Sequence, residues 1–402
     1  KNEKKIDLVV KKLLNSKRPL IHLGHGVKLS NSHKIIKKFF SKYKIPFLLT
    51  WNADDVISNN HKMYFGKPGA FGHRSSNFIV QNCDFYLSIG TRLPFMVTGY
   101  NAKNFAKNAN FKCMVDIDQN ELKNVNTKIN LKIKSDANLF LNKFYRKISK
   151  FKSKKGWISY CQKIKKKYPI VLNQMKIKKK YVNSYYFVDC LSKVLSKNEL
   201  IVTDMGFSFT SSHQAMNLRE NQNFYTNSGH APMGWGLPAA IGGYFATKKT
   251  TKNFICLTGE GGFQMNIQEL ATVMHQKIPL KIFIFNNGGY LTIKQTQLLG
   301  FRGRIMGADK KSGLSFPKYD KIAKAHGFNY YRLNNHSNLI EKIKKIISSK
   351  QATICELMMD PNEEQIPKAI NRRDKNGKSI PTELEDMYPF LPKDELNSNY
   401  IV

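Results

Sequence analysis

The chain has 402 residues, of which 41% are hydrophobic and 12% aromatic, and this composition is typical of a globular protein rather than a disordered one. No apolar run approaches the ~20 residues of a membrane-spanning helix, and the first residues lack the core of a signal peptide, so we expect a cytoplasmic protein that binds no membrane. The formal net charge of +38 suggests a nucleic-acid binder as an alternative class, but the lysines are spread along the whole chain, which argues against a nucleic-acid partner.

Residues 1–150 alternate strand-like and amphipathic stretches. The apolar runs "PLIHLG", "PFLLT", "CDFYLSIG" and "KCMVDID" are separated by stretches of helical length, which predicts parallel strands in a doubly wound sheet. The first run ends in Gly24 and Gly26, a GxG pair that suits either a phosphate-binding turn or a plain tight turn. We expect residues 1–150 to form a first, Rossmann-like domain.

The rest of the chain divides into a linker, a second domain and a tail. Residues 151–180 are rich in lysine and nearly free of glycine, and we expect them to link the two domains. A second series of strand-like runs ("ELIVTDMG", "NFICLTGEGG", "LKIFIFNNGG") follows within residues 181–370. Residues 371–402 are polar and contain proline, which indicates an extended tail on the surface. The predicted fold class is therefore α/β, with two doubly wound parallel-sheet domains.

The stretch Phe254–Tyr290 places polar groups at the ends of two strands. Apolar residues recur at helical spacing over residues 267–274, so this part is a helix that joins two apolar strands. A right-handed crossover makes these strands parallel, and their carboxyl ends then meet at one edge of the sheet. Glu260 follows the first strand, and Asn286 and Asn287 follow the second. Ligands of open α/β sheets bind at this edge.

These groups suit a magnesium ion that holds a phosphate. Carboxylate and amide oxygens, completed by main-chain carbonyls, water and phosphate oxygens, form the shell that Mg²⁺ prefers. The glycines beside Glu260 allow a phosphate to approach the backbone. Each part also has a simpler explanation: a carboxylate is favourable at a helix N-terminus, and two asparagines are common in a turn. Their placement on two strand ends joined by one crossover favours the metal site.

The pattern GEG, a helix, a strand and then NN resembles the thiamine diphosphate (ThDP) motif. The stretch "GGFQMNIQELATVMHQKIPLKIFIFNNGGYL" resembles the large subunit of the acetolactate synthase (acetohydroxyacid synthase) family. The runs "RPLIHLGHG", "FGKPGAFG", "LSIGTRL" and "VDIDQNEL" resemble the central domain of that family, and "TDMG", "APMGWGLPAAIG" and "FPKYDKIAKAHGF" resemble its diphosphate-binding domain. The resemblance covers nearly the whole chain and implies ThDP and Mg²⁺ as cofactors.

The same resemblance implies which residues form the site. Mg²⁺ would be bound by Glu260, Asn287 and the main-chain carbonyl of Gly289. Met233 matches the apolar residue that holds ThDP in its bent conformation, although an ordinary core methionine is the simpler interpretation of this residue alone. The residues expected around the cofactor are Gly206, Phe207, Ser208, Met233, Gly259, Gly261, Gly262 and Asn287, and those expected near the substrate are Lys294, Thr296 and Gln297.

The chain departs from the family in three places and lacks one part. The family has aspartate at the position of Glu260 and tryptophan at the position of Thr296, and Met96 replaces its second arginine. FAD stays open, with Gly24, Gly26, Arg92, Asp116 and Asp136 as the residues that the resemblance places near it. Nothing in the chain resembles the family's pyrimidine-binding domain, which carries the activating glutamate. We therefore expect a piece of a longer enzyme, inactive alone, whose catalytic glutamate lies outside this chain.

The resemblance implies a carboligase in branched-chain amino-acid biosynthesis that decarboxylates pyruvate and transfers the two-carbon unit to a second 2-oxo acid. Two alternatives keep the cofactor: transfer to another acceptor such as a keto sugar, which Thr296 and the unusual tail favour slightly, and simple decarboxylation of a 2-oxo acid. Because ThDP sites of this family form between subunits, we expect a homodimer or tetramer.

Overall fold

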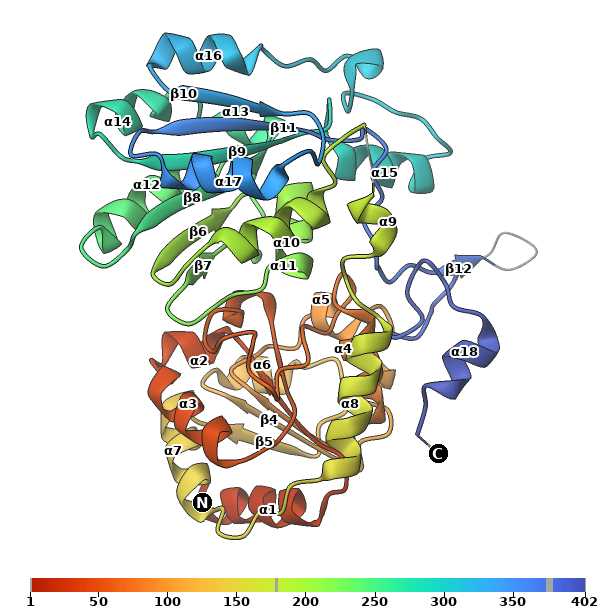
Figure 1. Ribbon diagram of the computed structural model, residues 1–402. Coiled ribbons are helices and arrows are strands. Elements are labelled where there is room, and N and C mark those ends of the chain that lie inside the picture. The colour runs from red at the N-terminus through yellow and green to blue at the C-terminus, as the bar shows by residue number, and fades with distance from the viewer. Residues whose placement is uncertain (1, 178–179, 374–378, 402) are drawn as a thin grey trace. The chain divides into compact units, whose positions relative to one another are not determined.

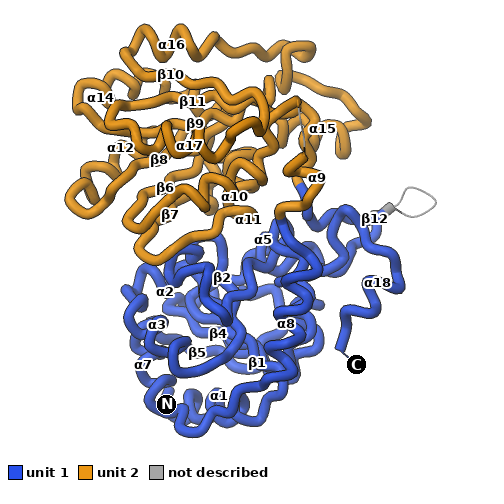
Figure 2. The backbone as a smooth tube through the Cα atoms, viewed as in Figure 1, with its two compact units in different colours: residues 1–170, 366–402 blue, residues 171–365 orange. Residues whose placement is uncertain are grey.

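The computed structural model describes residues 2–177, 180–373 and 379–401, so short parts of the expected linker and tail lie outside the described residues. The chain divides into two compact units, coloured separately in Figure 2. Unit 1 comprises residues 1–170 and 366–402, and unit 2 comprises residues 171–365. Each unit is built around one all-parallel sheet with helices on its faces, which confirms the predicted fold class.

The sheet of unit 1 has five strands in the described part of the chain, in the order β2-β1-β3-β4-β5. Its strands are short and almost entirely buried, as expected for a parallel sheet covered on both faces. They are β1 (Pro19–Leu23), β2 (Phe47–Leu49), β3 (Phe85–Ile89), β4 (Phe111–Asp116) and β5 (Leu131–Lys134).

Helices cover both faces of this sheet. The helices α1 (Asn2–Asn15), α3 (His33–Lys42) and α7 (Ala137–Lys147) pack their apolar stripes against one face, and α4 (Arg74–Asn82) and α8 (Lys155–Lys167) against the other. Asp136 starts α7 because its side chain accepts the main-chain N–H of Leu139. The shorter helices of this unit are α2 (His25–Leu29), α5 (Phe95–Thr98) and α6 (Gln119–Lys123), with 3₁₀ turns at Trp51–Ala53 and Ala102–Asn104.

The division into units differs from the sequence-based boundaries at the expected linker. Helix α8 lies inside the stretch 151–180, yet Trp157, Cys161 and Ile164 are buried in the core of unit 1. These residues fall three or four positions apart and therefore form an apolar stripe on an otherwise lysine-rich helix. Because the rest of the helix is rich in lysine, the sequence of this stretch resembles a solvent-exposed linker.

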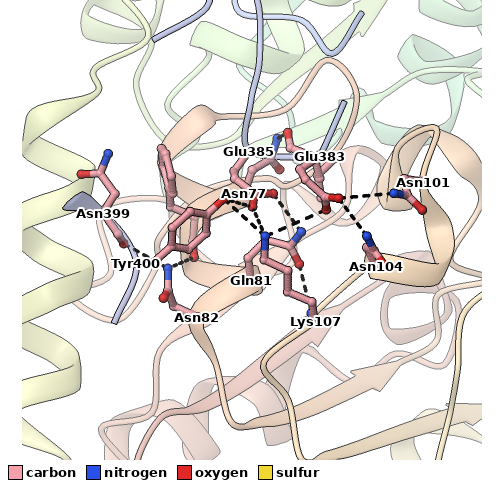
Figure 3. Close-up of polar contacts among 12 residues, drawn as sticks. Asn77, Gln81, Asn82, Asn101, Asn104, Lys107, Glu383, Glu385, Asn399 and Tyr400 are labelled. Carbon is pink, nitrogen blue, oxygen red and sulfur yellow. Dashed lines mark hydrogen bonds and ion pairs between the residues drawn. The ribbon is translucent and has the colours of Figure 1, made fainter. Parts of the chain in front are cut away.

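The tail also differs from the extended surface segment that its composition suggests, because it packs as part of unit 1. Leu384 and Met387 are buried. The tail contains the short antiparallel pair β12 (Arg372–Arg373) and β13 (Ser379–Ile380), and later the helix α18 (Lys393–Ser398). Figure 3 shows the polar contacts that hold it. The fully buried carboxylate of Glu385 accepts hydrogen bonds from Gln81 Nε2 and Lys107 Nζ, each at 2.8 Å, and from the hydroxyl of Tyr400.

The sheet of unit 2 has six strands in the described part of the chain, in the order β10-β11-β9-β8-β6-β7 (Figure 1). All of its pairings are parallel. The strands are β6 (Glu199–Thr203), β7 (Asn223–Tyr225), β8 (Asn253–Gly259), β9 (Leu280–Asn286), β10 (Asn329–Leu333) and β11 (Thr353–Met358).

The helices of unit 2 also lie on both faces. Helices α10 (Ser184–Val194) and α17 (Leu339–Ser348) pack together on one face, and α12 (Gly236–Thr247), α14 (Glu269–His275) and α16 (Tyr319–His326) pack on the other. The remaining helices are α9 (Asn173–Lys176), α11 (Phe207–Ala215), α13 (Glu260–Met265) and α15 (Leu291–Gly300), with a 3₁₀ turn at Lys310–Ser312. Among the described residues, no helix is long and apolar enough to cross a membrane.

Candidate functional site

The site expected from the sequence lies at the carboxyl edge of the sheet of unit 2. After β6 the chain forms β7 on one side of that strand and then β8 on the other. The carboxyl ends of β6 and β8 therefore mark the point where the strand order reverses, which is where open α/β sheets bind ligands. Asp204 follows β6, Glu260 follows β8, and Asn287 follows β9, the next strand of the sheet.

Glu260 is a buried carboxylate at the first position of α13. It is 1% exposed, and its Oε1 accepts the main-chain N–H of Gly288 at 2.7 Å and that of Gly289 at 3.3 Å. Burial raises the pKa of Glu260 to about 8, although these main-chain donors favour the charged form. A bound cation would favour the ionised carboxylate and so compensate for the loss of water.

The two asparagines after β9 have different surroundings. The amide of Asn286 is paired on both sides: its Nδ2 donates to Glu356, and its Oδ1 accepts the N–H of Gly288 at 3.1 Å. Asn287 is 7% exposed, and its Oδ1 is buried without a hydrogen-bond partner in the part of the chain that the structure describes. An unpaired buried acceptor is costly, and a cation is the kind of partner that it lacks. The carboxylate of Glu260 and the amide oxygen of Asn287 are therefore suitable ligands for Mg²⁺.

The turn after β6 offers room for an anion. Gly206 has a φ of +90°, a conformation that favours glycine, and the position of a side chain there is open space. It precedes α11, whose first residues are Phe207 and Ser208, and as the N-cap residue it has no side chain that could accept their main-chain N–H groups. The exposed main-chain N–H groups of a helix N-terminus bind phosphate groups well. Gly259 likewise has open space at the position of its missing side chain.

Two glycines of α13 are required by close packing. A Cβ atom on Gly261 would lie 2.0 Å from the ring of Tyr290 and 2.7 Å from the terminal methyl group of Met233. A Cβ atom on Gly262 would lie 2.2 Å from Oδ2 of Asp204. The half-buried side chain of Met233 is thus held against the backbone of α13, beside Glu260.

Asp204 is not among the site residues predicted from the sequence. It is 1% exposed and accepts hydrogen bonds from the N–H of Met205 at 2.8 Å, the N–H of Gly234 at 3.1 Å and Oγ1 of Thr258 at 3.0 Å. It therefore ties the end of β6 to the end of β8 and to the turn that carries Met233. The signal available in the sequence was an aspartate directly after an apolar strand and before a glycine, in "TDMG".

The three residues expected near the substrate lie on α15 and are engaged locally. Lys294 forms an ion pair with Asp309 at 3.2 Å. The exposed Thr296 donates its hydroxyl to the carbonyl of Thr292 within the same helix, and the amide of Gln297 bonds the main chain of Met306 in both directions. The last two contacts hold the loop after α15 against the helix.

The residues expected near FAD lie in unit 1, where each of them has contacts within the protein. A Cβ atom on Gly24 would lie 2.3 Å from the carbonyl oxygen of Gly90, and one on Gly26 would lie 2.7 Å from Cα of the same residue, so these two glycines permit contact between two loops. The polar members also have protein partners: Arg92 pairs with Glu121, Asp116 accepts the N–H of Asp118, and Asp136 caps α7. These contacts are local to unit 1, and none of them indicates a flavin.

Comparisons with known proteins agree with this arrangement. The family described as "Thiamine pyrophosphate enzyme, central domain" matches residues 6–144, and "Thiamine pyrophosphate enzyme, C-terminal TPP binding domain" matches residues 204–357. The second match begins at Asp204, directly after β6, and includes the ends of β8 and β9.

Relatives with known names are similar over most of the chain. A probable acetolactate synthase large subunit of Methanocaldococcus jannaschii is 30% identical over 366 residues, which are 89% of this chain and 60% of that protein. The corresponding protein of Methanococcus aeolicus is 29% identical over 375 residues, with 89% and 61% covered. The acetolactate synthase isozyme 2 large subunit of Escherichia coli is 24% identical over 402 residues, with 97% and 64% covered. The chain thus spans about three fifths of the length of these relatives.

Proposed function

Because the chain belongs to the thiamine pyrophosphate enzymes, with their central and C-terminal domains, we propose that it is part of a ThDP- and Mg²⁺-dependent carboligase. The enzyme would decarboxylate pyruvate and transfer the two-carbon unit to a second 2-oxo acid, as the names of its relatives suggest. The observation that carries this proposal is the pair formed by the buried Glu260 and the unpaired Oδ1 of Asn287, at neighbouring strand ends.

In this proposal each group at the edge has one task. Glu260, Asn287 and the carbonyl of Gly289 hold Mg²⁺. The turn at Gly206 and the first N–H groups of α11 bind the diphosphate, and Met233 supports the cofactor from the side of α13. Bound ThDP supplies the carbanion and accepts the electrons left by CO₂. The protein orients the reacting groups and keeps water away from them.

FAD, which the resemblance leaves open, is not part of the proposal, because no contact among the described residues of unit 1 points to a flavin. An acceptor other than a 2-oxo acid, such as a keto sugar, is the second candidate. It is favoured by Thr296, a small, exposed side chain where the family has a bulky tryptophan. A decarboxylase without carboligation is the third candidate.

We further propose that the enzyme is at least a dimer. Several apolar side chains on α15 and the loop after it are exposed, among them Leu298 at 47%, Phe301 at 61% and Met306 at 79%. Clustered apolar side chains of this kind are commonly covered by another chain or domain. Light scattering of the purified full-length gene product should show a mass of two subunits or more, and a monomer at micromolar concentration would contradict this part of the proposal.

The direct test is to express the full-length gene product and supply ThDP, Mg²⁺ and pyruvate. The proposal predicts that CO₂ and acetolactate form and that both depend on the metal. Release of CO₂ without acetolactate would favour the decarboxylase, and carboligation only when a keto sugar is added would favour the second candidate. The 402-residue chain alone is expected to bind the diphosphate end of the cofactor without turnover, so pyruvate consumption by this chain would contradict the expectation.

A further inference from the structure

One buried carboxylate of unit 2 has no task in the proposed site. Glu356 lies in β11, whose sequence "TICELM" is otherwise free of charged residues and almost entirely buried. It is only 6% exposed. A carboxylate in such a strand is costly unless it is hydrogen-bonded. The groups that hydrogen-bond to Glu356 therefore identify the contacts that stabilise it in this strand.

Glu356 joins three strands on one face of the sheet. Strand β11 lies between β9 and β10, with Met358 opposite Asn286 and Glu356 opposite Arg332. Glu356 and Asn286 are therefore diagonal neighbours on the same face. Oε1 of Glu356 accepts Nδ2 of Asn286 at 2.5 Å, while Oε2 accepts the hydroxyl of Tyr330 and lies 3.6 Å from Nε of Arg332.

These contacts decide which way the amide of Asn286 points. With Nδ2 directed at the carboxylate, Oδ1 faces the N–H of Gly288, which it accepts at 3.1 Å. In the reversed orientation the amide oxygen would face a carboxylate and Nδ2 would face another donor, so both hydrogen bonds would be replaced by repulsion. The N–H of Gly288 is shared with Oε1 of Glu260 at 2.7 Å. The orientation of Asn286 therefore helps to fix the turn that contacts Glu260.

We propose that Glu356 is a positioning residue for the metal-binding turn. It directs Asn286 to close the turn over residues 286–289, and this leaves the amide oxygen of Asn287 for the cation. Two consecutive asparagines thereby have separate tasks: the first bonds the protein and the second faces the metal. The inference rests on the proposed function, because it assigns Glu356 a role toward the Mg²⁺ of that site.

The test measures metal binding by the 402-residue chain in the presence of ThDP. Mn²⁺ replaces Mg²⁺ as the probe, because the electron paramagnetic resonance signal of free Mn²⁺ reports how much metal is bound. Removing an outer partner of a metal ligand typically weakens metal affinity about 10- to 100-fold. Glu356 acts on the ligands through Asn286, so we expect a loss at the lower end of this range, about tenfold, for Glu356→Leu. Glu356→Gln keeps an oxygen that accepts Nδ2 of Asn286, and it should bind Mn²⁺ within about threefold of the parent if a single hydrogen bond is what matters.

Two further variants separate positioning from general stability. Tyr330→Phe removes the other hydrogen bond of Glu356 and should leave Mn²⁺ affinity within about twofold of the parent, because the contact with Asn286 remains. Asn286→Ala breaks the same contact from the other side and replaces Glu356→Leu if that variant does not fold. Its loss of affinity should likewise be about tenfold or more.

The outcomes are distinguishable. If Glu356→Leu melts at a lower temperature but binds Mn²⁺ like the parent, Glu356 is merely structural and the proposal is wrong. If Glu356→Gln fails as badly as Glu356→Leu, the orientation argument is wrong. If the parent itself binds no Mn²⁺ with ThDP, the proposed function fails instead. Hydrogen exchange at the amide of Gly288 then tests the turn by itself: exchange should be faster in Glu356→Leu than in the parent, and equal rates would overturn the inference.

Discussion

Replacing the buried carboxylate of Glu260 by an amide should change how the stability of the metal-free protein depends on pH. Burial raises the pKa of Glu260 from 4.5 to about 8. Between these values the native state keeps a proton that the unfolded state has released. The stability of the parent protein therefore falls as pH rises through this window. The difference between the two pKa values corresponds to a total loss of roughly 5 kcal/mol in the free energy of unfolding once the pH exceeds 8, at about 1.4 kcal/mol for each pKa unit.

The variant Glu260→Gln has no charge to bury at any pH. Its Oε1 can still accept the N–H of Gly288, but an N–H₂ group now replaces a carboxylate oxygen among main-chain N–H donors, which costs about 1–3 kcal/mol. The variant should therefore be less stable than the parent at pH 5 and more stable than the parent at pH 8.5, by at least about 2 kcal/mol. The two stability curves should cross between about pH 5 and pH 7.

The assay is urea unfolding in EDTA, followed by circular dichroism from pH 5 to pH 9. The exposed Glu341 supplies the matched control, because Glu341→Gln removes a carboxylate from the same unit and should follow the parent at every pH. Curves of parent and Glu260→Gln that stay parallel across the whole range would refute the argument that burial of this carboxylate opposes its ionisation. Curves that cross only in EDTA, and not with Mg²⁺ and ThDP, would add that the cation stabilises the ionised form.

Three further substitutions give separate tests. Gly261→Ala places a methyl group against packed side chains, so it should lower the free energy of unfolding by about 1–3 kcal/mol and weaken the stabilisation of the protein by ThDP. Gly242→Ala is the control: the space around Gly242 is open, so the melting temperature of this variant should not fall below that of the parent. Asp204→Asn turns an acceptor of main-chain N–H groups into a partial donor, and should cost about 1–3 kcal/mol in urea unfolding and reduce ThDP affinity; unchanged affinity would contradict its role. Lys107→Met leaves the carboxylate of Glu385 buried without its cation and should lower the free energy of unfolding of unit 1 by about 3 kcal/mol. Adding Glu385→Gln removes the buried charge and should restore most of this loss. Additive losses in the double variant would show that the two residues act independently.

Local patterns predicted the strands and helices that border the proposed site. The run before Glu260 and the run before Asn287 are buried strands, and the helical spacing between them made those strands parallel neighbours. These features depend on residues close together in the sequence, where periodicity is informative. The fold class followed from the same patterns.

The features that the sequence did not predict depend on contacts between distant segments. Nothing local distinguishes Asn286 from Asn287, because their difference comes from Glu356, which lies 70 residues after the first of them. The tail looked polar and extended, yet its carboxylates at Glu383 and Glu385 meet side chains more than 270 residues earlier. The apolar stripe of α8 was obscured by lysines that cover its exposed side. In each case the residues that the feature contacts lie far away in the sequence, so a local pattern cannot predict the contact.

Glu260 stands where the resembled family has aspartate, and the structure shows how the longer side chain is accommodated. Its carboxylate reaches the turn after β9 and accepts two main-chain N–H groups there. The neighbouring glycines leave the backbone of α13 close to Met233 and Tyr290. The longer side chain thus extends from the start of α13 to the turn after β9.

The central claim is that Glu260 and Asn287 together bind a magnesium ion that holds the diphosphate of ThDP. Titration calorimetry of the 402-residue chain with Mg²⁺, in the presence of ThDP, tests it most directly when the parent is compared with Asn287→Leu. The account predicts that the parent binds Mg²⁺ and that the variant, although folded, binds it at least about tenfold more weakly. Equal binding by both proteins, or no binding by the parent, would contradict the account.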